Sequence, residues 1–277
     1  MAIFHKQKQA PLGAESALTL RTADGAPLYT FPGAVVNSMR HLETTLMYKG
    51  ALPARIAMVA ALRQEGVTYT TLALGTTLAY DLAVRVCVVE LNWWSPGIKT
   101  APPPENEAPA ASSRRLRRAK KPHGDNSSTT ITESQGAAIQ TSATTGLASV
   151  LMDNATLDEA LIQTALPNLM LLPAGNLSPA QRPAMARHDT LKACIKQLSR
   201  RFDHILLDVP AILATSDAIA LASLGTACCV VIRQGVTPVS HVRRAIDDVK
   251  HLSMLGVVLN QARMSLPNWV GAFIPQE

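Results

Sequence analysis

The chain has 277 residues, of which 47% are hydrophobic and 17% are charged, and its net charge is +6. This length and composition allow the buried core of one large α/β domain or of two small ones. No apolar run approaches the roughly 18 to 20 residues of a membrane span, and the first residues lack the apolar core of a signal peptide. We therefore expect a cytoplasmic protein.

Two features of the composition have simple interpretations. The four cysteines (Cys87, Cys194, Cys228 and Cys229) have no CxxC spacing and mostly fall in apolar runs, which predicts core packing. Much of the positive charge lies in one run, Arg114 to Lys121, so the folded part is closer to neutral. This run either binds DNA or anionic lipid, or is a solvated linker.

The first third of the chain predicts an arm followed by a βαβ unit. Residues 1–34 have few periodic apolar positions and are expected to form a flexible N-terminal arm. Val35 to Leu46 has the spacing of an amphipathic helix. The apolar runs Arg55 to Ala61 and Val84 to Glu90 flank a helical pattern at Thr70 to Tyr80, which is typical of two parallel, buried strands.

The middle of the chain separates two parts of one predicted domain, residues 35–96 and 146–262. Residues 97–145 are rich in Pro, Ser and Thr with a basic cluster, and we expect a disordered insertion. Thr156 is placed to cap a helix whose first turn carries two acids. Residues 263–277 form a C-terminal tail.

Strands and helices alternate through the second part. The predicted strands are Leu169 to Leu172, Ile205 to Asp208, Ala227 to Arg233 and Gly256 to Asn260, and the helices are Thr190 to Phe202, Asp217 to Leu224 and Val239 to Leu252. Five or six buried strands with intervening helices predict a doubly wound, mostly parallel sheet in an α/β fold.

Ligands bind such sheets at the carboxyl ends of the strands. The first strand leads through a loop into a helix, which is the context of a phosphate-binding loop. Gly66 and Thr68 fit that motif, but Val67 stands at the lysine position. Asp208 ends an apolar strand and suits an aspartate that holds Mg²⁺ through water. An ordinary βα turn and a capped strand end would also produce these two patterns.

The loop resembles the segment VTSALPGEGKST of the bacterial tyrosine kinases of the capsular exopolysaccharide family, relatives of the MinD and ParA ATPases. Arg85 to Pro96 reads RVCVVELNWWSP and resembles their RVLLIDADLRRP. Further similar segments follow in chain order: GLASVLMDNATLDEAL, NLMLLPAGNLSPAQRP, FDHILLDVPAILATSDAIALAS and a final strand ending in GVVLN. The resemblance covers most of residues 35–262 outside the insertion. It implies a P-loop NTPase-like fold with helices on both faces of the sheet.

The resemblance also implies which residues form the site. The candidates are Arg63, Gly66, Val67, Thr68, Tyr69 and Asn260 for nucleotide binding, with Asn260 near the adenine, Thr68 and Asp208 for Mg²⁺, and Asp208, Glu90 and Asn92 for catalysis. Mg-ATP is the implied cofactor.

The departures from the family pattern fall where the chemistry is expected. Val67 replaces the lysine, Glu90 and Asn92 replace two aspartates, and Trp94-Ser95 replaces a basic pair. For Trp93 and Trp94, packing is expected rather than stacking on a ligand. The segment Asn37-x-x-Arg40-x-x-Glu43 keeps one residue of the ExxRxxR pattern with which these kinases form rings, and the tail contains no tyrosine.

Losing the lysine removes a contact worth roughly 1.5 to 3 kcal/mol. We therefore expect a degenerate, regulatory member of exopolysaccharide or capsule biosynthesis or export, with weak or absent ATP binding. The resemblance implies a membrane-embedded chain-length or export protein, an active kinase homologue or a second copy as partner, and a location at the inner face of the membrane. One alternative is an active tyrosine kinase or ATPase in which Arg63 and Glu90 substitute for the lost groups. Another is a ParA-like partitioning or scaffold ATPase that uses the basic run on DNA.

Overall fold

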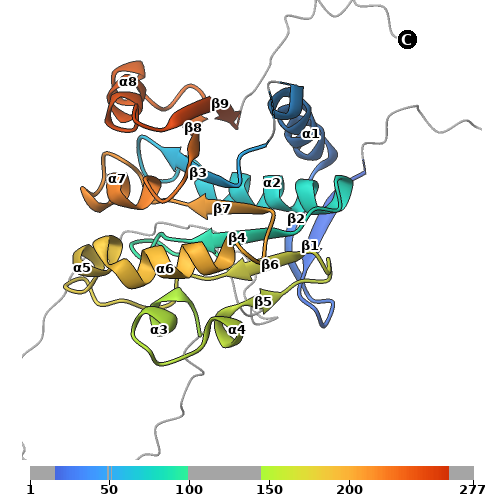
Figure 1. Cartoon of the computed structure of the whole chain (residues 1–277). Helices are drawn as coiled ribbons and strands as arrows, with labels where there is room; N and C mark the ends of the chain where they lie inside the picture. Colours follow the sequence, from blue (N-terminus) through green and yellow to red (C-terminus); the bar gives the residue numbers. More distant parts are fainter. Residues whose placement is uncertain (1–15, 49, 51, 99–144, 262–277) are drawn as a thin grey trace, which may run out of the picture.

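A computed structural model of the chain describes residues 16–48, 50, 52–98 and 145–261 (Figure 1). The predicted insertion and C-terminal tail lie almost entirely outside these residues. The strands are β1 (Leu18–Arg21), β2 (Pro27–Phe31), β3 (Arg55–Ala60), β4 (Val86–Glu90), β5 (Ile162–Gln163), β6 (Leu169–Leu172), β7 (His204–Asp208), β8 (Ala227–Arg233) and β9 (Ser253–Asn260). The helices are α1 (Gly33–Tyr48), α2 (Val67–Asp81), α3 (Leu147–Leu151), α4 (Leu157–Ala160), α5 (Arg182–Arg187), α6 (Asp189–Leu198), α7 (Asp217–Ala222) and α8 (Val239–Asp248).

The described residues form a seven-stranded sheet in the order β5-β6-β4-β7-β3-β8-β9. Only β5 is antiparallel to its neighbour, and all the other pairs are parallel. Parallel neighbours joined by helices require both faces of the sheet to be covered. The predicted doubly wound α/β fold is confirmed, including the strands predicted at residues 169–172 and 227–233.

The two faces of the sheet carry separate parts of the core. Along β3, Ala57 and Val59 pack with α6 and α7 on one face, whereas Ile56 and Met58 pack with α1 and α2 on the other. This follows from the two-residue period of a strand, which sends successive side chains to opposite faces. In Figure 1, α6 and α7 lie in front of the sheet and α2 lies behind it.

Helix α2 is buried along most of its length although it contains five threonines. Three of their hydroxyls donate to the carbonyl four residues earlier: Thr71 to Val67, Thr76 to Leu72 and Thr77 to Ala73. Because buried hydroxyls need a partner, these bonds allow a threonine-rich helix to lie against the sheet.

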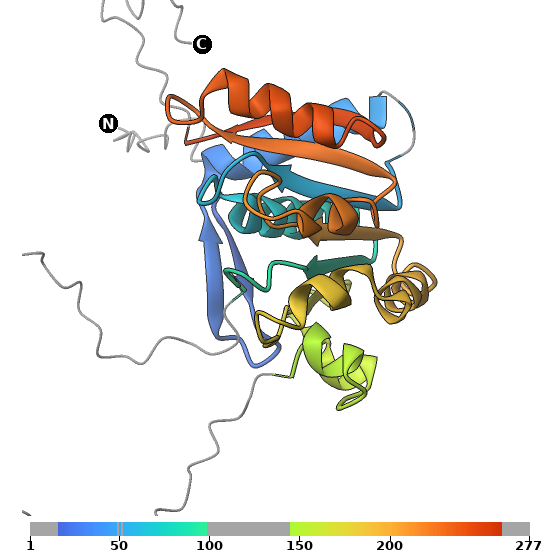
Figure 2. The ribbon, with the colours of Figure 1, turned by 90° about the vertical axis from the view of Figure 1, so that its left-hand side faces the viewer.

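The prediction of a flexible arm over residues 1–34 is wrong from Leu18 onward, and its residues 1–15 lie outside the described part of the chain. β1 and β2 form an antiparallel hairpin that packs on the α2 side of the sheet (Figure 2). Leu20 and Phe31 are each only 1% exposed, and the Phe31 ring lies 5.2 Å from that of Tyr69. Two isolated apolar anchors do not produce the periodic pattern by which a strand is recognised.

Two other expectations have clear outcomes. The four cysteines are buried and unpaired, as predicted. Within the part of the chain that the structure describes, no helix is long and apolar enough to cross a membrane.

Candidate functional site

The loop between β3 and α2 is shaped by two residues in the left-handed region of backbone conformation. Gln64 has φ 63° and Gly66, which precedes the first turn of α2, has φ 90°. A β-carbon at Gly66 would overlap the side-chain nitrogen of Asn260, which donates to the Glu65 carbonyl at 2.8 Å. The sequence thus places glycine where both conformation and space require it.

Gly66→Ala is expected to destabilise the protein by about 3 kcal/mol, from roughly 1 to 2 kcal/mol of left-handed strain plus the displaced Asn260 bond. Urea denaturation would measure the loss. Gly235→Ala is the matched control, because Gly235 has φ 72° but no atom within 4 Å of the added carbon. Equal losses for the two variants would contradict the role assigned to Asn260.

Glu65 is a residue of this loop that the sequence did not single out. Its side chain is buried, with the residue 3% exposed, and accepts hydrogen bonds from the Ala61 backbone N–H at 3.1 Å and from the Thr237 hydroxyl. The carboxylate therefore ties the loop to the segment between β8 and α8. Backbone N–H groups of such a loop attract a phosphate, and a carboxylate within the loop opposes that attraction.

Thr68 and Asp208 lie together beneath the loop. The Thr68 hydroxyl donates to Asp208 Oδ2 at 2.6 Å, while Oδ1 is buried with no hydrogen-bond partner. Burial raises the pKa of Asp208 to about 8, and the charge of Glu90 adds to the shift, although the Thr68 bond opposes it. An orphaned carboxylate oxygen beside a hydroxyl fits Mg²⁺, which prefers oxygen ligands. These two residues would hold such an ion.

Glu90, at the end of β4, accepts hydrogen bonds from backbone N–H groups through both of its carboxylate oxygens. One carboxylate oxygen accepts from the N–H groups of Gly97 and Ile98, the latter at 2.9 Å, and the other accepts from Ala174 at 2.9 Å. Burial raises its pKa, and these bonds oppose the shift. Glu90 thereby fastens the segment after β4 to the segment after β6.

The residues after β4 differ in their roles. Asn92 accepts from the Ser95 N–H at 3.2 Å through its side-chain oxygen. Trp93 is 2% exposed and its indole N–H donates to the Ala174 carbonyl at 2.9 Å, so its predicted packing role is confirmed. Trp94 lines the pocket beside the loop, and the Arg182 guanidinium lies 5.8 Å from its ring centre.

The predicted nucleotide-binding residues divide between two pockets. Arg63, Gly66, Val67 and Thr68 line a pocket of about 380 Å³ together with Asn92 and Trp94. Tyr69 and Asn260 line a second pocket of about 550 Å³ between α1 and β9, and Gly66 borders both. Among the described residues lining the first pocket, Arg63 is the single cation and is exposed, and Glu65 is the single acid.

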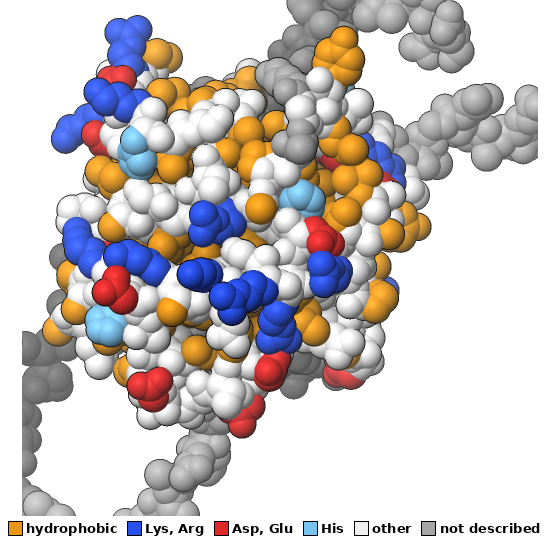
Figure 3. Space-filling model, in the orientation of Figure 1, with side chains coloured by type: hydrophobic (Ala, Val, Ile, Leu, Met, Phe, Trp, Pro, Cys, Tyr) orange, Lys and Arg blue, Asp and Glu red, His pale blue; other side chains and the backbone are white. Residues whose placement is uncertain are grey.

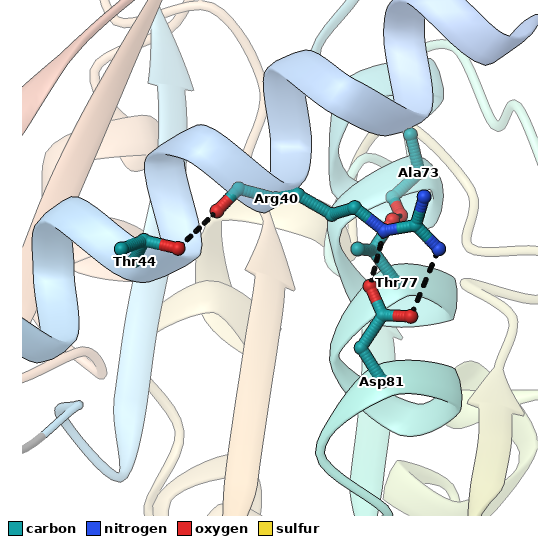
Figure 4. A network of polar contacts seen from close by, with 5 residues as sticks. All are labelled: Arg40, Thr44, Ala73, Thr77 and Asp81. Atoms are coloured by element: carbon teal, nitrogen blue, oxygen red, sulfur yellow. Dashed lines mark hydrogen bonds and ion pairs between the residues drawn. The ribbon is translucent and has the colours of Figure 1, made fainter. Parts of the chain in front are cut away.

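The remaining arginine of the ring-forming pattern is used within the chain. Figure 4 shows Arg40 reaching from α1 to Asp81 on α2, with Nε 2.7 Å from Oδ2 and an Nη 3.0 Å from Oδ1. Glu43, on the same helix, is buried, and one of its oxygens has no partner. Burial raises the pKa of Glu43. The bidentate Arg40–Asp81 ion pair joins α1 and α2 behind the sheet.

The fold and the loop define a P-loop-type α/β protein. In sequence, residues 137–265 match the family model described as cellulose biosynthesis protein BcsQ. The chain is 27% identical over 126 residues to the tyrosine-protein kinase CpsD of Streptococcus agalactiae. The matched segment covers 45% of this chain and 55% of that protein. The chain thus spans about half the length of this relative.

Solved structures show the same fold. The kinase domain of the Escherichia coli tyrosine kinase ETK superposes with a TM-score of 0.62 at 14% identity, over 95% of this chain and 86% of that one. The cell division ATPase MinD of Pyrococcus furiosus superposes with a TM-score of 0.50 at 19% identity, over 79% and 78%. The predicted resemblance to capsular tyrosine kinases and MinD-related P-loop proteins is confirmed: the chain is a homologue of the former and shares the fold of both.

Proposed function

We propose that the chain is a regulatory, tyrosine-kinase-like P-loop protein of exopolysaccharide or capsule biosynthesis or export, which binds Mg-ATP weakly or not at all. The observation that carries the proposal is Val67, which opens α2 at the position from which a lysine reaches the phosphates. A valine offers neither charge nor a hydrogen-bond donor to a phosphate.

The rest of the pocket supports this proposal, because it does not replace the lost charge. Arg63 is exposed on the loop, and the buried Glu65 carboxylate cancels its formal charge. Thr68 and Asp208 fit a magnesium ion, so the metal contacts are kept while the contact to phosphate is lost. When bound, Mg²⁺ would supply charge neutralisation for phosphate oxygens.

The main alternative is an active kinase in which Glu90 serves as general base. A base must lie within hydrogen-bond reach of the hydroxyl that it deprotonates. Both Glu90 oxygens already accept from backbone N–H groups, which favours a structural role. We therefore propose that the protein acts through its surface, on a membrane-embedded export component, an active kinase homologue or another copy of itself, at the inner face of the membrane.

Calorimetric titration with Mg-ATP and Mg-ADP tests the proposal. The wild type is expected to show no saturable binding at about 0.1 mM nucleotide, whereas Val67→Lys should bind about tenfold or more tightly, since a charge-assisted bond contributes roughly 1.5 to 3 kcal/mol. Val67→Gln, of similar length but uncharged, is the control. Tight wild-type binding with phosphate transfer to tyrosine would overturn the proposal and make Arg63 the next residue to change.

A further inference from the structure

A groove separates helices α6 and α7 on the face of the sheet turned to the viewer in Figure 1. It has a volume of about 690 Å³ and includes Ala54 and Arg55 at the start of β3, and Thr226 just before β8. The phosphate-binding loop follows the opposite end of β3. A ligand in this groove would therefore not compete with a ligand at the loop.

The walls of the groove are positively charged. Arg55, Lys192 and Lys196 line it, and none of its lining residues within the described chain is acidic. Figure 3 shows Lys and Arg side chains in a band across this face, over α5 and α6. Arg200 follows Lys196 by four residues, and neither it, Lys196 nor Arg55 forms an ion pair with a described residue. Lys192 pairs with the exposed Asp189 on the same helix at 2.9 Å, so Arg55, Lys196 and Arg200 are the cations free for an external anion.

The floor of the groove is apolar and recessed. It includes Ile195, which is 1% exposed, and the partly buried Ala220 and Leu224. A flat bilayer surface cannot reach apolar atoms at the bottom of a groove, whereas an apolar side chain that protrudes from a peptide can. Lys192 and Lys196 are four residues apart and so lie on one face of α6, beside this floor.

We propose that the α6–α7 groove docks an acidic, amphipathic segment of a partner protein. Its apolar side chains enter the groove, while its carboxylates meet Arg55 and Lys196 and compete with the exposed Asp189 for Lys192. Helix-in-groove recognition has this form. The inference goes beyond the proposed function, because it holds whether or not the loop binds nucleotide.

The test uses the full chain and a fluorescein-labelled synthetic helix of about 18 residues, five turns long, with leucines along one stripe and glutamates on both flanks. Fluorescence anisotropy at low salt should give saturable binding. The double variant Lys192→Glu/Lys196→Glu should weaken binding by about tenfold or more, because each lost attraction becomes a repulsion. Ala220→Trp, which fills the floor and leaves the charges intact, should also weaken it.

The matched control is Arg243→Glu/Arg244→Glu on α8, which makes the same charge change at two exposed residues away from the groove. We expect this variant, and Val67→Lys, to leave the affinity for the peptide nearly unchanged. If the α8 variant weakens binding as much as the α6 variant, the attraction is non-specific and the proposal is wrong.

Two further outcomes would also overturn it. A peptide with serines in place of the leucines must bind about tenfold more weakly, since equal binding would mean that the apolar floor is not used. Binding to phosphatidylglycerol vesicles that depends on Lys192 and Lys196, without peptide binding, would identify a membrane surface instead. Circular dichroism establishes that each variant is folded. Should Ala220→Trp fail to fold, the α6 double variant and the serine peptide decide the question.

Discussion

Replacing Glu90 by alanine is expected to lower the free energy of unfolding by about 4 kcal/mol. The substitution orphans the partly buried N–H group of Gly97 and the buried N–H groups of Ile98 and Ala174. Each buried donor left without a partner costs roughly 1 to 3 kcal/mol. It also opens a cavity where the buried side chain lay. The loss should appear as a lower midpoint of urea denaturation.

Glu90→Gln provides the comparison, because it keeps the shape and one acceptor oxygen. It should lose only part of the stability that Glu90→Ala loses, since one N–H then faces an amide NH₂ group. The catalytic alternative predicts a different pattern. If both variants are about as stable as the wild type but lose phosphate transfer, Glu90 acts on a substrate and the structural role is wrong.

Much of the sheet could be predicted because its central strands are short apolar runs. β8 and β6 match their predicted bounds, since parallel strands buried on both faces contain few polar positions. The β1–β2 hairpin was missed because only Leu20 and Phe31 anchor it deeply. Its attachment depends on contacts with distant residues, such as the 3.0 Å bond from the Ala165 N–H to the Arg21 carbonyl.

The site could be predicted where one residue type fits one backbone position. Gly66 and Thr68 follow β3, and Asp208 ends β7, so the topology brings Thr68 and Asp208 within hydrogen-bond distance. Long-range partners were not predictable. Glu65 is fixed by Thr237, 172 residues away, and Glu90 by Ala174, 84 residues away. Local sequence patterns carry no information on such pairs, so the backbone partners of Glu90 could not be predicted. Its catalytic role, which the family resemblance implies, stays a prediction.

Asp208→Asn is expected to stabilise the protein progressively, relative to the wild type, as the pH rises from about 4 to about 8. In the folded protein the pKa of Asp208 is raised to about 8, mainly by burial, whereas an unfolded aspartate has a pKa near 3.9. The native state therefore holds a proton that the unfolded state releases. By linkage, this contribution to stability is complete below about pH 4 and is lost as the pH rises through about 8.

The asparagine variant does not titrate, but its side-chain oxygen still accepts from Thr68, so it resembles the protonated aspartic acid. One pKa unit corresponds to about 1.4 kcal/mol, so the stability difference between variant and wild type should change by on the order of 5 kcal/mol across the window. Glu90 is present in both the wild type and the variant. Taking the difference between their stabilities therefore removes most of the pH dependence that Glu90 itself contributes. The expected gain measures the cost of an ionised carboxylate with an orphaned oxygen.

Urea denaturation at pH 5, 6, 7 and 8 in the presence of EDTA would measure this difference, since Mg²⁺ favours the ionised aspartate. Asp203→Asn is the control, because Asp203 is exposed and its ion pair with Arg85 lowers its pKa to about 2. Its stability difference from the wild type should stay constant over this range. If Asp208→Asn also gives a constant difference, Asp208 is ionised throughout and a cation or a rearrangement must satisfy Oδ1. If the stability difference grows with pH as expected, the Asp208 carboxylate is protonated at neutral pH, and a magnesium ion must displace that proton in order to bind.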